Sequence, residues 1–170
     1  HILYQHVFQT SLRVTRRVAW CTALADLLHE FHLRKPEPIA SVLANLREMA
    51  RDWRQAAECF LLAARHAARI YADTETAALA QRGLANLNHL PPSTERSRLE
   101  LRLQTTLGAA LMTSNSYASG MVKQVYLRAE ELCRELVDQR QLFRVQFGLS
   151  IICAVRGEFT RARSLAEECL

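Results

Sequence analysis

Two histidines in "HEFH", His29 and His32, come closest to metal chemistry by type and spacing. Their spacing of three residues lets them share a helix face, but the zinc-binding HExxH motif spaces its histidines by four. The sequence places no third ligand near them. A histidine pair at a helix end or on the surface is the commoner arrangement, so we predict no metal site.

Acids, bases and nucleophiles in catalytic arrangements are equally sparse. Adjacent glutamates point to different sides of a helix, which favours solvated charge for Glu130 with Glu131 and for Glu167 with Glu168. The polar loop "TSNSYASG" carries Ser114, Ser116 and Ser119 without a base beside them. GxxxxGK[ST] does not occur, and the five glycines are scattered. We therefore predict no catalytic residue, no cofactor and no enzymatic activity in this chain.

The five cysteines indicate a reducing compartment. They are odd in number and far apart, form no CxxC, and stand among apolar neighbours: Cys21, Cys59, Cys133, Cys153 and Cys169. This pattern argues against a disulfide framework and a zinc site. Small buried thiols explain it better, so we predict a cytoplasmic protein. The apolar stretches are too short for a membrane span, so we expect no membrane partner.

The net charge of +5 is the excess of 22 basic over 17 acidic residues, and the basic residues are all arginines except Lys35 and Lys123. A basic balance suggests nucleic acid or acidic partners. The charges are interleaved, however, as in "TERSRLELR", and no basic run exceeds the two residues of Arg16 with Arg17. We therefore expect the charged residues to lie on solvent-exposed helix faces, and not to form a basic patch that follows a phosphate backbone. An Arg-rich helical repeat that binds nucleic acid remains the alternative, and arginines ranked along one groove would favour it.

Helical periodicity runs through the whole chain and predicts an all-α protein of about eight helices. Prolines in "RKPEP" and "LPPST" separate helices, and Ser93 or Thr94 is expected to cap the one that follows. The helix from Leu142 to Val155 is apolar almost all round and is predicted to be the most buried. The predicted helices cover residues 15–31, 39–49, 53–71, 73–87, 94–111, 122–136, 142–155 and 159–169.

Two stretches share one pattern, "RDWRQAAECFLLA" from Arg51 and "GEFTRARSLAEEC" from Gly157. Each has a turn residue, an acid and an aromatic residue, followed by small residues at helical spacing. The acid favours the N-terminus of the next helix, and the aromatic residue is expected to plug the base of a helical hairpin. The short connections predict antiparallel hairpins stacked side by side.

This pattern resembles the second half of a tetratricopeptide repeat, and "TLGAAL" (Thr106 to Leu111) resembles the core of its first half. The repeats are degenerate, because the spacing is uneven and "SYASGMVKQVY" carries an insertion. The stretch from "LANLREMARDWRQAAECF" to "AEELCREL" also resembles the helical repeats that follow the ATPase module of bacterial signal-transduction ATPases. Those proteins carry an adenylate or guanylate cyclase or a DNA-binding domain.

The resemblance implies that residues 1–35 are a helical segment following an ATPase module that lies outside this chain. Residues 36–170 would be the tetratricopeptide-like repeats of a larger protein. The first helix of each pair would line a concave groove. Its groove-facing positions would include Asn45, Arg102, Thr105, Ala109, Met112, Arg144 and Phe147.

Arginines beside apolar residues in such a groove could clamp a carboxylate or an acidic peptide. Met112 and Phe147 are explained equally well as core residues, whereas Arg102 and Arg144 are expected to be exposed in either case. We therefore expect a non-catalytic scaffold or ligand-sensing arm of an intracellular signalling protein. Its partner would be a protein or peptide, another domain of the same chain or a small-molecule effector, rather than nucleic acid. A homodimer through the repeat ends is a third alternative.

Overall fold

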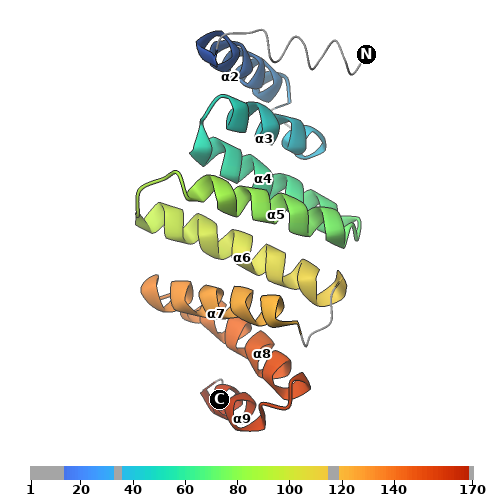
Figure 1. Ribbon diagram of the computed structural model, residues 1–170, viewed down its shortest axis with the longest axis vertical. Coiled ribbons are helices and arrows are strands. Elements are labelled where there is room, and N and C mark those ends of the chain that lie inside the picture. The colour runs from blue at the N-terminus through green and yellow to red at the C-terminus, as the bar shows by residue number, and fades with distance from the viewer. Residues whose placement is uncertain (1–13, 33–35, 115–118, 169–170) are drawn as a thin grey trace.

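The computed structural model describes residues 14–32, 36–114 and 119–168. These residues are helical throughout, without a strand, and Figure 1 shows the helices stacked in chain order along the long axis. This confirms the predicted all-α repeat fold, and each of the eight predicted helices occurs with ends that differ by a few residues. The elements are α2 (Val14–Phe31), η1 (Glu37–Ile39), α3 (Ala40–Met49), α4 (Trp53–Arg69), α5 (Asp73–Leu87), α6 (Thr94–Ser114), α7 (Gly120–Glu135), α8 (Gln139–Val155) and α9 (Phe159–Glu168).

Four of the helix junctions are the same tight turn. In each, one residue has a positive φ, and the next residue donates its N–H to the carbonyl five residues back. The positive φ angles are 61° at Arg51, 58° at Tyr71, 54° at Val137 and 77° at Gly157. After two of these turns an aspartate caps the next helix: the Asp52 carboxylate accepts the Gln55 N–H at 3.2 Å at the start of α4, and the Asp138 carboxylate accepts the Gln141 N–H at 3.1 Å at the start of α8. The sequence pattern predicted that Asp52 favours the N-terminus of α4. Ser93 likewise caps α6, because its hydroxyl accepts the Arg96 N–H at 3.2 Å.

The turns also show which helices are equivalent. α4 lies between the turns at Arg51 and Tyr71, and α8 lies between those at Val137 and Gly157. Both helices have 17 residues. The sequence pattern instead matched the start of α4 to the start of α9. This happened because the same turn occurs before α8, at Val137, and again after it, at Gly157, just before α9 begins.

Alternate helices lie on the same side of the stack. α4 packs on α6 as well as on its chain neighbours. On the other side, Glu48 of α3 pairs with Arg82 of α5, and Lys123 of α7 pairs with Glu158, the residue that precedes α9. The stack therefore has one side formed by α4, α6 and α8 and another formed by α3, α5, α7 and α9.

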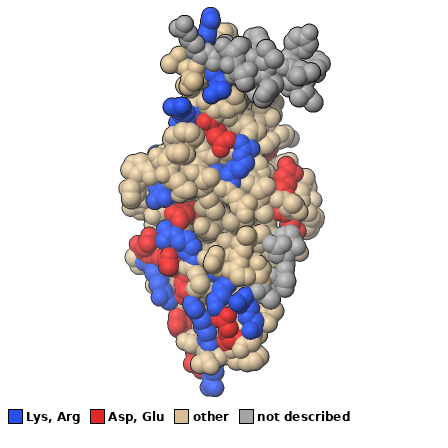
Figure 2. All heavy atoms as spheres, viewed as in Figure 1, with Lys and Arg blue, Asp and Glu red and all other residues tan. Residues whose placement is uncertain are grey.

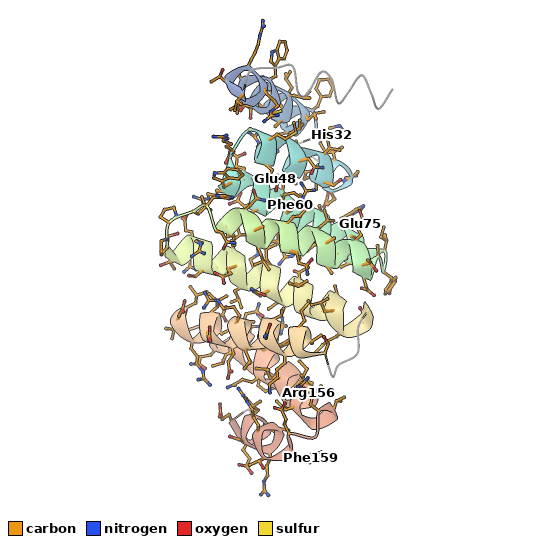
Figure 3. All side chains as sticks on the ribbon, viewed as in Figure 1. His32, Glu48, Phe60, Glu75, Arg156 and Phe159 are labelled. Atoms are coloured by element: carbon orange, nitrogen blue, oxygen red, sulfur yellow. The ribbon has the colours of Figure 1, made fainter. Side chains whose placement is uncertain are left out.

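Small residues let these helices approach closely. Five buried alanines line α4 around the fully buried ring of Phe60, which Arg82 covers with its guanidinium 4.5 Å from the ring centroid (Figure 3). A Cβ added at Gly83 of α5 would lie 2.7 Å from Leu103 Cδ2. Cys21, Cys133 and Cys153 are buried as predicted, Cys59 is half-buried, and Cys169 lies outside the described residues. Burial raises the pKa of the Cys59 and Cys133 thiols to about 11.

Two predictions about burial are wrong. α8 is not enclosed, because Phe143, Phe147, Ile151 and Val155 are exposed along one side of it. α8 has α7 and α9 as neighbours, and these cover only the face that carries Leu149, Ile152 and Cys153. Phe159 does not plug a hairpin base but is 71% exposed at the start of α9 (Figure 3). In the described part of the chain, no helix combines the length and apolarity needed to cross a membrane.

Candidate binding groove

An open groove of about 710 Å³ lies between α4, α6 and α8. The first turn of α5 and Tyr126 of α7 also contribute to its lining. We call this feature the α4–α6–α8 groove. Its lining is formed by Arg65, Ala68, Arg69, Asp73, Thr76, Thr105, Thr106, Ala109, Ala110, Thr113, Tyr126, Gln141, Arg144 and Val145.

Tyr126 holds α6 and α8 at a defined separation. Its ring fits between two glycines, because an added Cβ at Gly108 would lie 2.6 Å from Cε2 and one at Gly148 would lie 2.5 Å from Cε1. The phenol hydroxyl donates to the Met112 sulfur at 3.3 Å. The ring edges are therefore enclosed by two helix backbones, and the groove keeps its width as long as both glycines remain.

Arginines give the groove a positive charge. Arg65 and Arg69 are one turn apart on α4, Arg102 stands on α6 next to Arg65, and Arg144 projects from α8. Within the described residues, Arg65, Arg102 and Arg144 form no ion pair, and Arg69 reaches Glu37 only at 3.9 Å. Partial burial, followed by the charges of Arg102 and Arg69, lowers the pKa of Arg65. These side chains share a positive field that is not neutralised by the fold.

Among the described residues that line the groove, the one acid is Asp73, which stands in the first turn of α5. Glu58 lies nearby, in a smaller hollow that Arg65 and Arg102 also line. Arg102, which lines that smaller hollow together with Arg65, also lines a second hollow of about 380 Å³ where α4 meets α6. There Arg54 is already neutralised, since it pairs with Glu95 at 2.8 Å and with Glu58 at 3.3 Å. Arg65 and Arg144 therefore line the α4–α6–α8 groove without an acid partner among the described residues, whereas the lining of the second hollow combines four arginines with two glutamates, both of which pair with Arg54.

The threonines of the groove present their methyl groups rather than free hydroxyls. Thr105 donates to the Leu101 carbonyl at 2.9 Å, and Thr106 donates to the Arg102 carbonyl at 2.8 Å. Thr113 donates to the Ala110 carbonyl at 2.9 Å. Each hydroxyl is thus used within its own helix. Together with Ala109, these residues form a weakly apolar floor between the arginines.

The structure brings together three of the residues expected in a groove, because Thr105, Ala109 and Arg144 line it. Arg102 lies outside this lining, next to Arg65 in a smaller hollow and also in the second hollow. Arg102 and Arg144 are exposed, as expected.

The other three residues lie elsewhere. Met112 is half-buried against the core and bonded to Tyr126, so it is a packing residue. Asn45 is exposed on α3, which belongs to the other side of the stack, and it does not line the groove. Phe147 is 56% exposed on α8 outside the lining, three residues after Arg144.

Sequence reasoning missed the contribution of α4. Arg65 and Arg69 in "ARHAAR" are four residues apart and so share one helix face, which was the available signal. The Trp53 pattern assigned α4 to the second half of a repeat, whereas the groove was expected along the first helix of each pair, so the arginines of α4 were not considered as groove residues. Packing instead places α4 on the same side of the stack as α8, because both helices line the groove.

Other chemistry does not gather near the groove. His29 and His32 lie exposed at the C-terminal end of α2, where Figure 3 labels His32. In residues 14–32, 36–114 and 119–168, no three His, Cys, Asp or Glu side chains are grouped so as to hold a metal ion. Ser116 lies outside the described residues.

The fold and groove define the class of an all-α helical-repeat protein. No protein-family model, curated protein or solved structure matches the chain. The resemblance to tetratricopeptide repeats of signal-transduction ATPases therefore stays a prediction.

Proposed function

We propose that this chain is a non-catalytic scaffold arm of an intracellular signalling protein, and that its α4–α6–α8 groove receives an acidic segment of a protein partner. The observation that carries the proposal is that Arg65 and Arg144 line the groove, with Arg102 beside Arg65 in an adjoining hollow, and that none of the three has an ion-pair partner among the described residues. A carboxylate placed between such arginines accepts charge-assisted hydrogen bonds from two sides. That partner could equally be another domain of the same polypeptide.

The groove supports a peptide better than a small-molecule effector. It is open along its length and combines arginines with alanines, threonine methyl groups and Val145. Small-molecule sites are mostly enclosed and apolar, with few polar groups. An extended or helical segment would place carboxylates on the arginines and aliphatic side chains on the floor between them.

Nucleic acid is the second candidate, and the ranking of arginines along one groove is the observation that favours it. The arrangement of charges on the surface favours the peptide instead. On the face shown in Figure 2, acidic and basic side chains are interleaved, without a continuous basic track.

Fluorescence anisotropy with four labelled probes tests the proposal. The probes are a peptide of repeated Asp-Leu-Glu-Phe units, its Asn-Leu-Gln-Phe counterpart, and single- and double-stranded oligonucleotides, each at low and moderate salt. We expect the acidic peptide to bind most tightly. Arg65→Gln or Arg144→Gln should each weaken its binding about tenfold, since a hydrogen bond to a charged group contributes roughly 1.5–3 kcal/mol.

Arg161→Gln is the matched control, because Arg161 is exposed on α9 and lies outside the groove. Tighter oligonucleotide binding that falls steeply with salt and depends on Arg65 would establish the nucleic-acid alternative. Equal effects of Arg161→Gln and Arg65→Gln would mean that binding follows net charge alone, and the groove would lose its assignment.

A further inference from the structure

Helix α2 lies at the end of the stack (Figure 1). A stripe of large apolar side chains runs along its exposed side. Its members stand at spacings of four, three and four residues, so they lie nearly in line on one helix face. Their exposed fractions are 65% for Trp20, 48% for Leu24, 59% for Leu27 and 89% for Phe31. The helix uses another face, with Cys21 and Ala25, to pack on α3.

From this stripe and the charges at its two ends, we infer that α2 pairs antiparallel with α2 of a second copy of the chain. The inference is independent of the groove and of the partner proposed for it. A twofold axis beside Ala23 and Leu24 would place Trp20 of each copy against Leu27 of the other. Ala19 and Ala23 are exposed beside the stripe and are small enough to let two helices approach closely.

The charges select the orientation. Arg16 and Glu30 are exposed, lie 14 residues apart on the side of the stripe, and form no ion pair within the described residues. A rise of about 1.5 Å per residue separates them by roughly 21 Å along the helix. Antiparallel pairing brings Arg16 of each copy beside Glu30 of the other, twice by symmetry. Parallel pairing would oppose Arg16 to Arg16 and Glu30 to Glu30, which is repulsive.

Self-complementarity distinguishes a second copy from an unrelated partner. The stripe presents apolar side chains over its whole length, with a cation at one end and an anion at the other. Such a surface matches itself after a twofold rotation, as an isologous interface requires. The exposed side of α8 lacks this arrangement, because the residues beside its apolar side chains include Arg140 and Arg144 without an acid.

Charge reversal tests the pairing on the full chain by sedimentation velocity over a range of concentrations. We expect the wild-type chain to form a species of twice its 19.4 kDa. Arg16→Glu alone and Glu30→Arg alone should each raise the dimer Kd about tenfold or more, because each opposes like charges in the dimer. The double variant should restore the wild-type Kd.

The single variants do not weaken α2 itself. Arg16→Glu places an acid in the first turn of the helix, and Glu30→Arg places a base in the last turn, both of which the helix dipole favours. Leu24→Ser should abolish the dimer, whereas Val42→Ser, at an exposed position on α3, should leave it intact. Circular dichroism of each variant verifies that the helices are retained.

Cysteine cross-linking provides a second measure of orientation. Ala23→Cys lies next to the proposed axis and should form an intermolecular disulfide on oxidation. Val14→Cys should not, because antiparallel pairing separates the two copies of residue 14 by about 28 Å along the axis. A monomeric wild-type chain, a charge-swapped variant that stays monomeric, or cross-linking through Val14→Cys would each overturn the inference.

Discussion

Replacing Gly148 by alanine tests whether Tyr126 separates α6 from α8. The new Cβ would lie 2.5 Å from Tyr126 Cε1 and 3.2 Å from both Cδ1 and Cζ. A comfortable carbon–carbon contact is about 3.5–4.0 Å, so the closest pair falls short by roughly 1 Å. The ring cannot retreat, because Gly108 stands against its opposite edge and an added Cβ there would be 2.6 Å from Cε2.

The expected free-energy change combines two opposing effects. Overpacking a core costs about 1–3 kcal/mol, whereas glycine to alanine within a helix gains about 1 kcal/mol. We therefore expect Gly148→Ala to lower the free energy of unfolding by about 1 kcal/mol. For a chain of this length, the melting temperature should fall by about 2–4 °C.

Urea denaturation followed by circular dichroism measures this change in wild type and in a Tyr126→Leu background. The smaller side chain removes the opposing ring, so the difference between the two Gly148→Ala effects isolates the steric cost of about 1–3 kcal/mol. Gly120→Ala is the control, because an added Cβ there meets nothing within 4 Å. If Gly148→Ala stabilises the protein as much as Gly120→Ala, or behaves identically without the Tyr126 ring, the packing argument is wrong.

Three further changes probe the turns, the α3–α5 contact and the ion pair before α9. Val137→Gly should raise the free energy of unfolding by about 0.5–1 kcal/mol in urea denaturation, because Val137 is 75% exposed with a φ of 54°, a conformation that disfavours Cβ. Asn86→Ala should cost about 1–2 kcal/mol in the same assay, since the buried amide donates to Glu48 Oε1 at 2.7 Å, whereas exposed Asn88→Ala should change little. Hydrogen bonds from Lys123 and Arg156 lower the pKa of Glu158 from 4.5 to about 2. The ionised Glu158 carboxylate therefore contributes fully to the stability of the fold above pH 4.5, and this contribution is lost as the pH falls through 2. Melting temperatures should therefore fall less between pH 4.5 and 2 in Glu158→Gln than in wild type.

The helices were predictable because their signals are local. Apolar spacing, prolines and capping residues act within a few residues of where they stand, as Ser93 does for α6 and Asp52 for α4. The signal is strongest in α4, where alanines alternate with polar residues at helical spacing and the same residues prove buried. The turn at Arg51 was also readable, because an acid follows a residue that reverses the chain.

Apolar composition predicted burial less well. Phe147 and Ile151 have the side chains of core residues, yet both are exposed, because burial of a helix face depends on whether another helix covers it. Phe159 matches Trp53 in the sequence pattern, but only Trp53 finds a partner, a stacked His89 ring at 4.2 Å. These differences come from neighbours that are distant in the sequence.

The amino-acid sequence by itself determined an all-α chain, the positions of its helices, and turns that fold successive helices antiparallel. It did so because hydrogen bonding, capping and helical periodicity are properties of short segments. Only the tertiary structure decided which helices share a side of the stack. That arrangement brings Arg65 of α4 beside Arg102 of α6 and across from Arg144 of α8. The same turn recurs before α4 and on both sides of α8, so packing between helices, and not local pattern, places Arg65 and Arg144 in one groove.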